Sequence, residues 1–245
     1  MQADYALTVA DGGLPPHARA ELAAALAVLD RGGGALVRAA RRVARIAGGR
    51  LLRGLGAGAA LEGLAHAALE RAYGIAVLGL PEAGAPVRRY DSPRAAQVAT
   101  AVSGAVSGAA GLAGAVPDAA LTTLLIMRQI ATAAVVEGED VRSEATRRAC
   151  LEVFALDASG EEGGYWAARL LLRGAPVAAM LAQAARTWSV ALADKLAAQA
   201  APLAGAAGGA LVNTAFLRHY RRMARAHFTV RRLERTYGAA AVRGY

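Results

Sequence analysis

A nearly uncharged stretch rich in glycine and alanine, from residue 97 to residue 136, constrains the fold more than any other part of the chain. Small residues recur in it every four positions, so two adjacent faces of a helix would carry almost no side chain. The two series are Ser103, Ser107, Gly111, Ala115 and Gly104, Gly108. Because other backbones can approach such faces closely, we expect a central helix over about 94–114 and a second helix that begins at Pro117 and Asp118.

The rest of the chain also favours helix over strand. Ala and Gly are abundant, aromatic residues make up 5% of the 245 positions, and β-branched runs bounded by turn residues are scarce. We therefore predict an all-α, single-domain helical bundle built around a glycine/alanine-rich central helix hairpin. Its expected parts are an N-terminal tail over 1–14, an N-terminal helical region over 15–80, a helical core over 94–237 and a C-terminal tail over 238–245.

Apolar periodicity and chain breakers locate the individual helices. We expect helices over 15–29, 35–46, 59–78, 141–156, 165–173 and 176–201, and a long helix that joins the glycine-rich stretch 203–217 to a basic segment ending near residue 237. On this last helix, one apolar face is predicted opposite an arginine-rich face. The apolar face comprises Phe216, Tyr220, Met223, His227 and Val230.

The net charge of +9 is concentrated in two arginine-rich segments. Residues 31–53 hold seven arginines and no acidic residue, and residues 218–235 hold seven arginines and one glutamate. Such clusters favour an anionic membrane surface as a partner. The side chains expected at that surface are Arg38, Arg41, Arg42, Arg45, Arg221, Arg222, Arg225 and Arg232. Nucleic acid is disfavoured as a partner, because interleaved aromatic residues and helix-turn-helix or zinc signatures are missing.

Two uncharged stretches, 95–116 and 196–217, are long enough to span a membrane. Both are poor in Leu, Ile and Phe, so they gain little from transfer into lipid, and we expect peripheral association rather than a span. Cys150 is the single cysteine, which excludes an internal disulfide, and the first thirty residues do not resemble a secretory signal. The expected location is the cytoplasm, at the inner face of the cell membrane.

No complete catalytic or metal-binding constellation is visible. Glu62, His66 and Glu70 share a helix face and could ligate a metal, but no second His or Cys lies at ligand spacing, so we expect a solvated stripe and neither metal nor cofactor. Ser103, Ser143 and Cys150 lack a His at motif spacing, and Cys150 is expected to be inert core. Asp118 is expected to cap a helix, with a functional carboxylate as the alternative.

Four segments resemble the EcsC family of bacterial proteins. They read SGAVSGAAGLAGAVPDAAL (103–121), RQIATAAVVEGEDV (128–141), CLEVFAL (150–156) and PLAGAAGGALVNTAFLRHYRRMARAHFTVRRLE (202–234). The likeness covers most of residues 94–235. The family is named for a protein encoded beside an ABC transporter, so the resemblance implies such a transporter as a possible partner. It implies no catalytic residues.

A helical bundle with small residues on some faces and large apolar residues on others can enclose a cavity. We therefore expect the protein to bind a lipid or another amphiphile, with an arginine holding the head group. The expected anchor is Arg128 or Arg218, and the expected lining is Phe154, Trp166, Met180, Trp188, Phe216 and Tyr220. The alternatives are a non-catalytic accessory protein of a transporter, an integral membrane protein, and an enzyme with an unrecognised site.

Overall fold

The computed structural model of the chain describes residues 13–30, 57–81, 83, 98–99, 115–156, 164–199 and 205–244. Within these residues every element is helical, which confirms the predicted all-α class. The helices are α2 (Pro16–Asp30), α4 (Ala57–Ala76), α6 (Ala115–Val136), α7 (Glu144–Leu156), α8 (Gly164–Leu172), α9 (Val177–Gln199), α10 (Gly205–Tyr237) and α11 (Ala239–Arg243). The expected helix over 35–46 and nearly all of the expected central helix over 94–114 lie outside the described residues.

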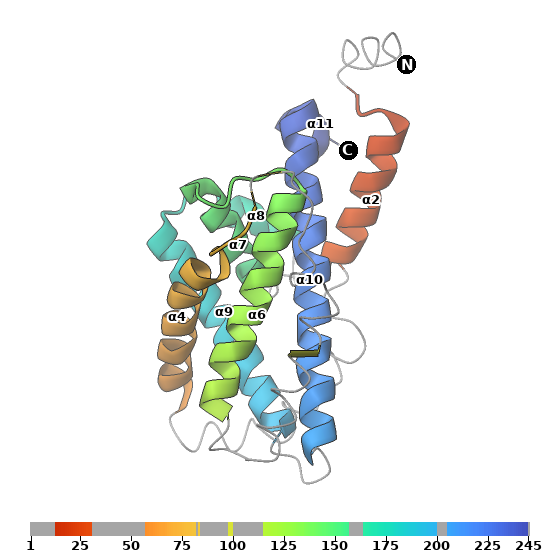
Figure 1. Cartoon of the computed structure of the whole chain (residues 1–245). Coiled ribbons are helices and arrows are strands. Elements are labelled where there is room, and N and C mark those ends of the chain that lie inside the picture. The colour runs from red at the N-terminus through yellow and green to blue at the C-terminus, as the bar shows by residue number, and fades with distance from the viewer. Residues whose placement is uncertain are drawn as a thin grey trace.

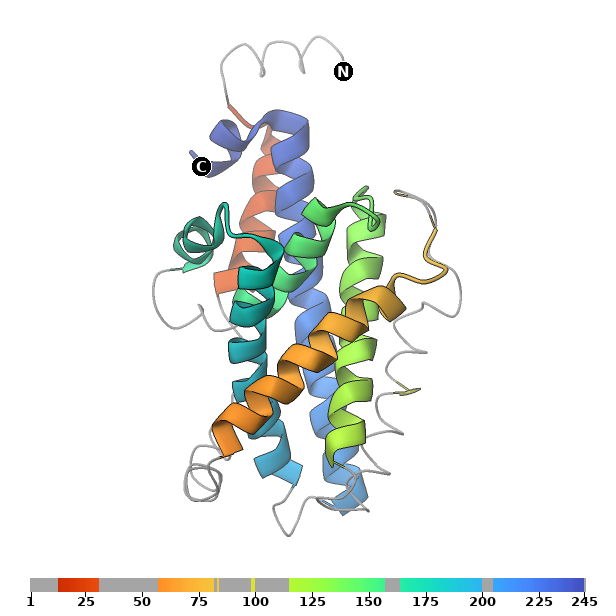
Figure 2. The same ribbon diagram turned by 90° about the vertical axis from the view of Figure 1, so that its left-hand side faces the viewer.

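Helices α2, α6, α7, α9 and α11 pack on helix α10 (Figure 1). Helices α6 and α9 run beside it, and α4 lies diagonally across α6 and α9, as Figure 2 shows. Helix α2 packs along the C-terminal half of α10, on the side away from α4. The short helices α7 and α8 contact each other, and α11 follows directly on the end of α10.

Buried apolar side chains from all eight described helices form one hydrophobic core, as expected for a single domain. Its centre is a group of four fully buried rings, Phe154, Trp188, Phe216 and Tyr220, which we call the aromatic cluster. The ring centroid of Trp188 lies 5.2 Å from Phe154, 6.3 Å from Phe216 and 5.2 Å from Tyr220. The indole Nε1 of Trp188 donates to Thr123 Oγ1 at 2.9 Å, so the polar atom of this ring is also satisfied.

The predicted faces of α10 are confirmed. Side chains of the apolar face are at most 2% exposed, whereas Arg218, Arg222 and Arg225 are exposed. The helix is continuous from Gly205 to Tyr237, so the glycine-rich stretch and the basic segment form one element, as expected. Helices of this length gain most of their stability from packing along one face, which the spacing of the large apolar residues provides here.

Helix α6 ends in a Schellman motif at Gly138. The Gly138 N–H bonds to the Val135 carbonyl at 3.0 Å and the Glu139 N–H to the Ala134 carbonyl at 2.9 Å. Gly138 adopts φ 82°, a left-handed conformation that glycine reaches without the steric cost of a side chain. The reversed chain buries Glu139, which is 7% exposed, next to α10.

Helix α7 begins at Glu144, three residues later than expected, because Ser143 serves as its cap. The Ser143 hydroxyl oxygen accepts from the Thr146 N–H at 3.1 Å, and the hydroxyl donates to the Asp140 carbonyl at 2.9 Å. Ser143, weighed above as a nucleophile, therefore has a structural role at this helix start.

At the C-terminal end of the chain, the expected tail over 238–245 contains α11, whose Val242 is buried in the core.

Helix α6 is long and apolar enough over Pro117–Val136 to cross a membrane, by length and composition, with a mean hydropathy of 1.6. In the described structure, 67% of the apolar 18-residue window of this helix is buried inside the protein. Asp118 lies in the first turn of α6 and is 3% exposed. Its Oδ1 accepts from Asn213 Nδ2 at 2.9 Å, which ties the start of α6 to α10.

Candidate functional site

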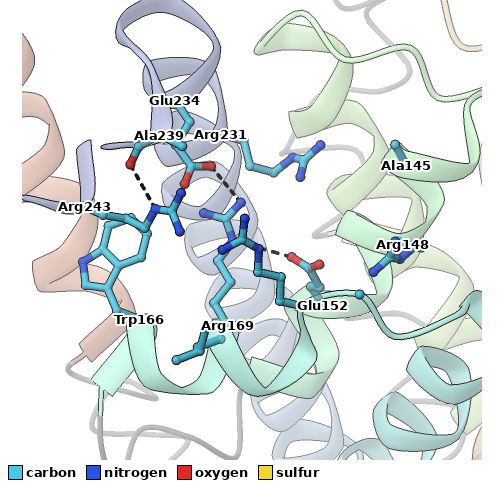
Figure 3. Close-up of a pocket in the computed structure, with 12 residues that line it drawn as sticks. Ala145, Arg148, Glu152, Trp166, Arg169, Arg231, Glu234, Ala239 and Arg243 are labelled. Carbon is cyan, nitrogen blue, oxygen red and sulfur yellow. Dashed lines mark hydrogen bonds and ion pairs between the residues drawn. The ribbon is translucent and has the colours of Figure 1, made fainter. Parts of the chain in front are cut away.

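A pocket of about 600 Å³ opens between α7, α8, α10 and α11, and we call it the arginine pocket. Figure 3 shows its side chains converging from these four helices. Five arginines and two glutamates contribute to the wall, together with an indole and a leucine. The lining residues are Ala145, Arg148, Glu152, Trp166, Arg169, Leu170, Arg173, Gly174, Arg231, Glu234, Ala239 and Arg243. An excess of positive charge beside apolar surface suits an anionic group with an apolar part.

Arg169 lies between the two glutamates of the pocket (Figure 3). Its Nη2 is 2.8 Å from Glu234 Oε2, whereas its Nε is 3.9 Å from Glu152 Oε2. The guanidinium also lies over the rings of Tyr165 and Trp166, with its carbon 5.8 and 6.0 Å from their centroids. Arg169 is therefore held firmly to Glu234 and only loosely to Glu152.

Arg231 enters the pocket from α10 and is fixed from behind by Glu139. Arg231 Nε donates to Glu139 Oε1 at 2.8 Å and Nη2 donates to Oε2 at 3.2 Å, a two-pronged ion pair. Arg235 pairs with the same carboxylate, and the Thr146 hydroxyl donates to it at 3.1 Å. Burial acts to raise the pKa of Glu139, but the hydrogen bond and charge of Arg231, with help from Arg235 and Thr146, lower it overall.

Behind the pocket wall, Glu152, His227 and Tyr165 form a chain of polar side chains. Glu152 Oε2 lies 3.4 Å from His227 Nε2, and His227 Nδ1 lies 3.1 Å from the Tyr165 hydroxyl. Burial holds the pKa of His227 well below its usual value, and the charges of Arg169 and Arg231 add to this. Burial also raises the pKa of Glu152, against the opposing charges of Arg169, Arg231 and Arg148. His227 is therefore neutral, and Glu152 takes up a proton more readily than an exposed glutamate.

Four buried polar atoms in and behind the pocket wall have no hydrogen-bond partner within the described part of the protein. They are Arg148 Nε, Arg169 Nη1, Glu152 Oε2 and His227 Nε2. Buried polar atoms are almost always hydrogen-bonded, because an unmade bond costs about 1–3 kcal/mol. Glu152 Oε2 and His227 Nε2 lie 3.4 Å from each other, so the hydrogen-bonding capacity that the described atoms of the wall leave unused is that of Arg148 and Arg169.

The start of α8, which carries Trp166 and Arg169 into the pocket, is held by α2. Asp30 Oδ1 accepts from the Tyr165 N–H at 2.9 Å, although 135 residues separate the two in sequence. Gly164 precedes Tyr165 with φ 72°, a left-handed conformation typical of glycine. In α11, Arg243 Nε donates to the Ala239 carbonyl at 3.0 Å, and Figure 3 shows this arginine beside Trp166.

Of the side chains predicted to bind the ligand, Trp166 lines the pocket. The four rings Phe154, Trp188, Phe216 and Tyr220 lie together in the aromatic cluster, and Met180 is fully buried in the same core. Arg128 Nη1 donates to the carbonyls of Ala76 and Leu78, at 2.6 Å each, and so binds the end of α4. Arg218 is exposed on α10. The predicted anchors and most of the predicted lining thus lie outside the arginine pocket.

The side chains predicted to face a membrane are divided in the same way. Arg222 and Arg225 are exposed on α10. Burial lowers the pKa of Arg221, and the charges of neighbouring arginines lower it further. Arg232 forms ion pairs with Glu21 and, at 2.7 Å, with Glu137. Arg38, Arg41, Arg42 and Arg45 lie outside the described residues.

Sequence reasoning missed the arginines and glutamates of the pocket, although two of them leave a signal. Glu152 is the single charge in CLEVFAL, and Arg169 is the single charge in GYWAARLLL, the sequence of α8. A lone charge inside an apolar helical run must find a partner when the helix packs, because an unpaired buried charge is costly. The remaining pocket arginines resemble ordinary surface arginines in sequence.

The other candidate groups do not gather into a site in the described structure. Glu62 and His66 are partly buried and Glu70 is exposed on α4, and across the described ranges no three His, Cys, Asp or Glu side chains are close enough to hold a metal ion. Cys150 is a buried free thiol whose pKa is raised, chiefly by burial, as expected for inert core.

Comparison with known proteins gives one family and no individual relative. No curated protein and no solved structure matches the chain. The model of the EcsC protein family matches residues 75–233, which is more than half of the chain and includes α6 to α9 and most of α10. The matched range begins within α4, upstream of the family-like segments noted in the sequence. The chain therefore belongs to the EcsC protein family.

Proposed function

We propose that this protein binds an anionic amphiphile in the arginine pocket, with its head group held by Arg148 and Arg169. The observation that carries this proposal is the pair of buried, unpartnered N–H groups, Arg148 Nε and Arg169 Nη1, in a wall with an excess of arginine. Carboxylate and phosphate oxygens are the acceptors that the planar guanidinium matches best. A ligand of this kind would accept hydrogen bonds from the two guanidinium groups and balance the charge of the wall.

The size and the apolar part of the pocket support an amphiphile over a small inorganic anion. A volume of about 600 Å³ lies within the range of roughly 300–1,000 Å³ typical of small-molecule sites. Trp166 and Leu170 provide apolar surface beside the arginines, and Leu170 is 65% exposed at the same time. An alkyl chain leaving the head-group site would cover this exposed surface.

Peripheral membrane association, at the inner face of the cell membrane, is part of the same proposal. Leu171 of α8 is 85% exposed next to the pocket, and Arg218, Arg222 and Arg225 are exposed along α10. Exposed leucines favour the acyl region of a bilayer, and each well-placed arginine contributes about 1 kcal/mol at an anionic surface. A transporter partner remains an expectation that rests on family membership alone.

The first experiment is organic extraction of the purified protein, followed by mass spectrometry. We expect an acyl compound with a carboxylate or phosphate head group at a stoichiometric amount. The emptied protein is then titrated with octyl sulfate below its micelle concentration, using calorimetry. Saturable binding to a single site supports the proposal.

Two variants locate the bound molecule. Arg148→Gln is expected to weaken octyl sulfate binding at least tenfold, because it removes a charged donor from the pocket wall. Arg186→Gln is the matched control, since Arg186 is exposed on α9 and hydrogen-bonds Gln183 outside the pocket. Equal loss of binding in both variants, or no binding to the wild-type protein, would refute the proposal.

A further inference from the structure

We propose that the arginine pocket binds its anionic head group together with a proton, which Glu152 carries. This inference rests on the proposed function and adds a second chemical requirement to it. The ligand class becomes an oxyanion that accepts hydrogen bonds from arginine and from a neutral carboxylic acid. The basis is the position of Glu152 between the pocket arginines and the buried pair of His227 and Tyr165.

Two of the three arginines around Glu152 are already engaged by other carboxylates. Arg169 of α8 pairs with Glu234 at 2.8 Å, and Arg231 of α10 pairs with Glu139 at 2.8 Å. Glu152 has Arg169 only at 3.9 Å, and its Oε2 accepts no hydrogen bond from a described residue. Within the described structure, Glu152 is thus the pocket carboxylate with the weakest support for a negative charge.

The charged and titratable groups around Glu152 come from three helices. Arg148 and Cys150 lie on its own helix α7, Arg169 and Tyr165 lie on α8, and the α10 groups are His227, Arg231 and Glu234. The arginines favour the ionised form of Glu152, whereas burial and Glu234 favour the protonated form. Burial has the largest effect, so the net shift of the pKa of Glu152 is upward.

The imidazole of His227 can accommodate Glu152 in both protonation states. It is neutral and fully buried, with Glu152 Oε2 3.4 Å from Nε2 and the Tyr165 hydroxyl 3.1 Å from Nδ1. In one tautomer Nε2–H faces the ionised carboxylate while Tyr165 donates to Nδ1. In the other, Nε2 accepts from the protonated carboxyl and Nδ1–H donates to Tyr165. Protonation of Glu152 therefore needs only a change of tautomer and hydroxyl direction.

An incoming anion changes the balance at Glu152. It competes for Arg148 and Arg169 and adds a negative charge beside the carboxylate, and both effects favour protonation. The neutral carboxyl removes the repulsion and leaves the arginine donors to the ligand. One proton is taken up from solvent for each anion bound, and no covalent bond to the ligand forms or breaks.

The test uses octyl sulfate, because its charge does not change between pH 5 and pH 9 and any proton taken up must bind to the protein. Calorimetric titrations at constant pH in buffers with different ionisation enthalpies give the number of protons taken up. We expect net uptake approaching one proton above the pKa of Glu152 in the empty protein. Over that range the affinity should fall by up to about tenfold per pH unit.

Glu152→Gln separates this inference from the proposed function. The glutamine imitates the neutral acid, so this variant should bind octyl sulfate at high pH more tightly than the wild-type protein, without proton uptake and with little dependence on pH. Glu144→Gln is the matched control, because Glu144 is exposed on the same helix, and it should keep the wild-type pH dependence.

Each outcome gives a clear result. Binding of octyl sulfate that is independent of pH in the wild-type protein, or proton uptake that persists in Glu152→Gln, would overturn the proton-linked site while leaving anion binding intact. If the wild-type protein binds no octyl sulfate at any pH, both the proposed function and this inference fail. Circular dichroism of each variant checks that it is folded.

Discussion

The aromatic cluster and the arginine pocket both use side chains of α7 and α10, but the cluster is closely packed and the pocket is open. In the aromatic cluster, four fully buried rings contact one another and the Trp188 indole N–H has its partner in Thr123. In the arginine pocket, charged side chains from four helices surround a cavity, and two arginine N–H groups lack a partner within the described residues. Close packing specifies a structure, whereas unused hydrogen-bonding capacity marks a place where something else can bind.

The contrast also separates two kinds of arginine on α10. Arg231, Arg232 and Arg235, near its C-terminal end, pair with glutamates from α2 and from the turn after α6. Arg222 and Arg225, nearer its middle, are exposed. The same residue type on one helix thus holds the bundle together at one place and presents charge to solvent at another.

The largest effect on stability is expected in the aromatic cluster. Trp188→Ala removes a fully buried indole and leaves Thr123 without its donor, so unfolding in denaturant should show a loss of about 3–5 kcal/mol. Trp166→Ala, at the partly buried edge of the pocket, should cost under about 1.5 kcal/mol but weaken octyl sulfate binding. If Trp166→Ala proved the more destabilising of the two, the division between core and pocket would be incorrect.

An intermediate loss is expected from Glu139→Gln. This change removes the carboxylate that holds Arg231 and Arg235, and we expect a loss of about 2 kcal/mol because both guanidinium groups keep partial access to water. Glu137→Gln is a suitable comparison, since Glu137 is less buried and pairs with Arg232. Equal stability of Glu139→Gln and the wild-type protein would show that the ion pairs of Glu139 with Arg231 and Arg235 do not stabilise the fold.

Acid should destabilise the protein through His227. Because its pKa is lowered by burial in the folded state, the folded protein binds fewer protons here than the unfolded chain, and stability is lost as the pH falls below about 6.5. Glu152 acts in the opposite direction: its raised pKa favours the folded state at low pH and loses that contribution as the pH rises. Thermal unfolding of His227→Asn between pH 7 and pH 5 should show a flatter profile than the wild-type protein. If stability falls as steeply with pH in His227→Asn as in the wild-type protein, His227 is not the group that makes the protein sensitive to acid.

The smallest effect on stability is expected outside both regions. Arg222→Gln on the exposed face of α10 should change the free energy of unfolding by less than about 0.5 kcal/mol. It should nevertheless weaken binding to vesicles that contain an anionic phospholipid, measured by flotation, by about 1 kcal/mol of binding free energy. Added salt should reduce this difference between the variant and the wild-type protein. Arg186→Gln on α9 is the control for a general loss of charge. A similar result for both variants would argue against a membrane role for this face.

The sequence alone was sufficient for most of the described helices, because their signals are local, but it assigned α11 to a C-terminal tail. Apolar spacing placed Phe216, Tyr220 and Met223 on the buried face of α10, and Pro176 marked the start of α9. The pocket depends on contacts between helices that are distant in the chain, such as the pair of Arg169 with Glu234. No periodicity within one helix reports such a contact.

The same reasoning explains why most of the predicted ligand-binding residues lie outside the arginine pocket. Large aromatic side chains at helical spacing are compatible with a packed core and with a cavity lining, and only the inter-helix geometry distinguishes the two. In this fold Phe154, Phe216 and Tyr220 fill the space around Trp188. Of the predicted aromatic residues, Trp166 alone lies on α8, at the edge of the bundle, where a cavity remains.

The contact between Asp30 and the Tyr165 amide has a practical consequence for where the protein can be divided. The family match covers residues 75–233, whereas Asp30 lies before it and Arg243, which lines the pocket, lies after it. A fragment cut at the family limits would lose the cap that holds the first turn of α8 and one wall of the cavity. The segment that defines the family is therefore shorter than the segment needed to complete the pocket. Expression boundaries should follow the longer segment.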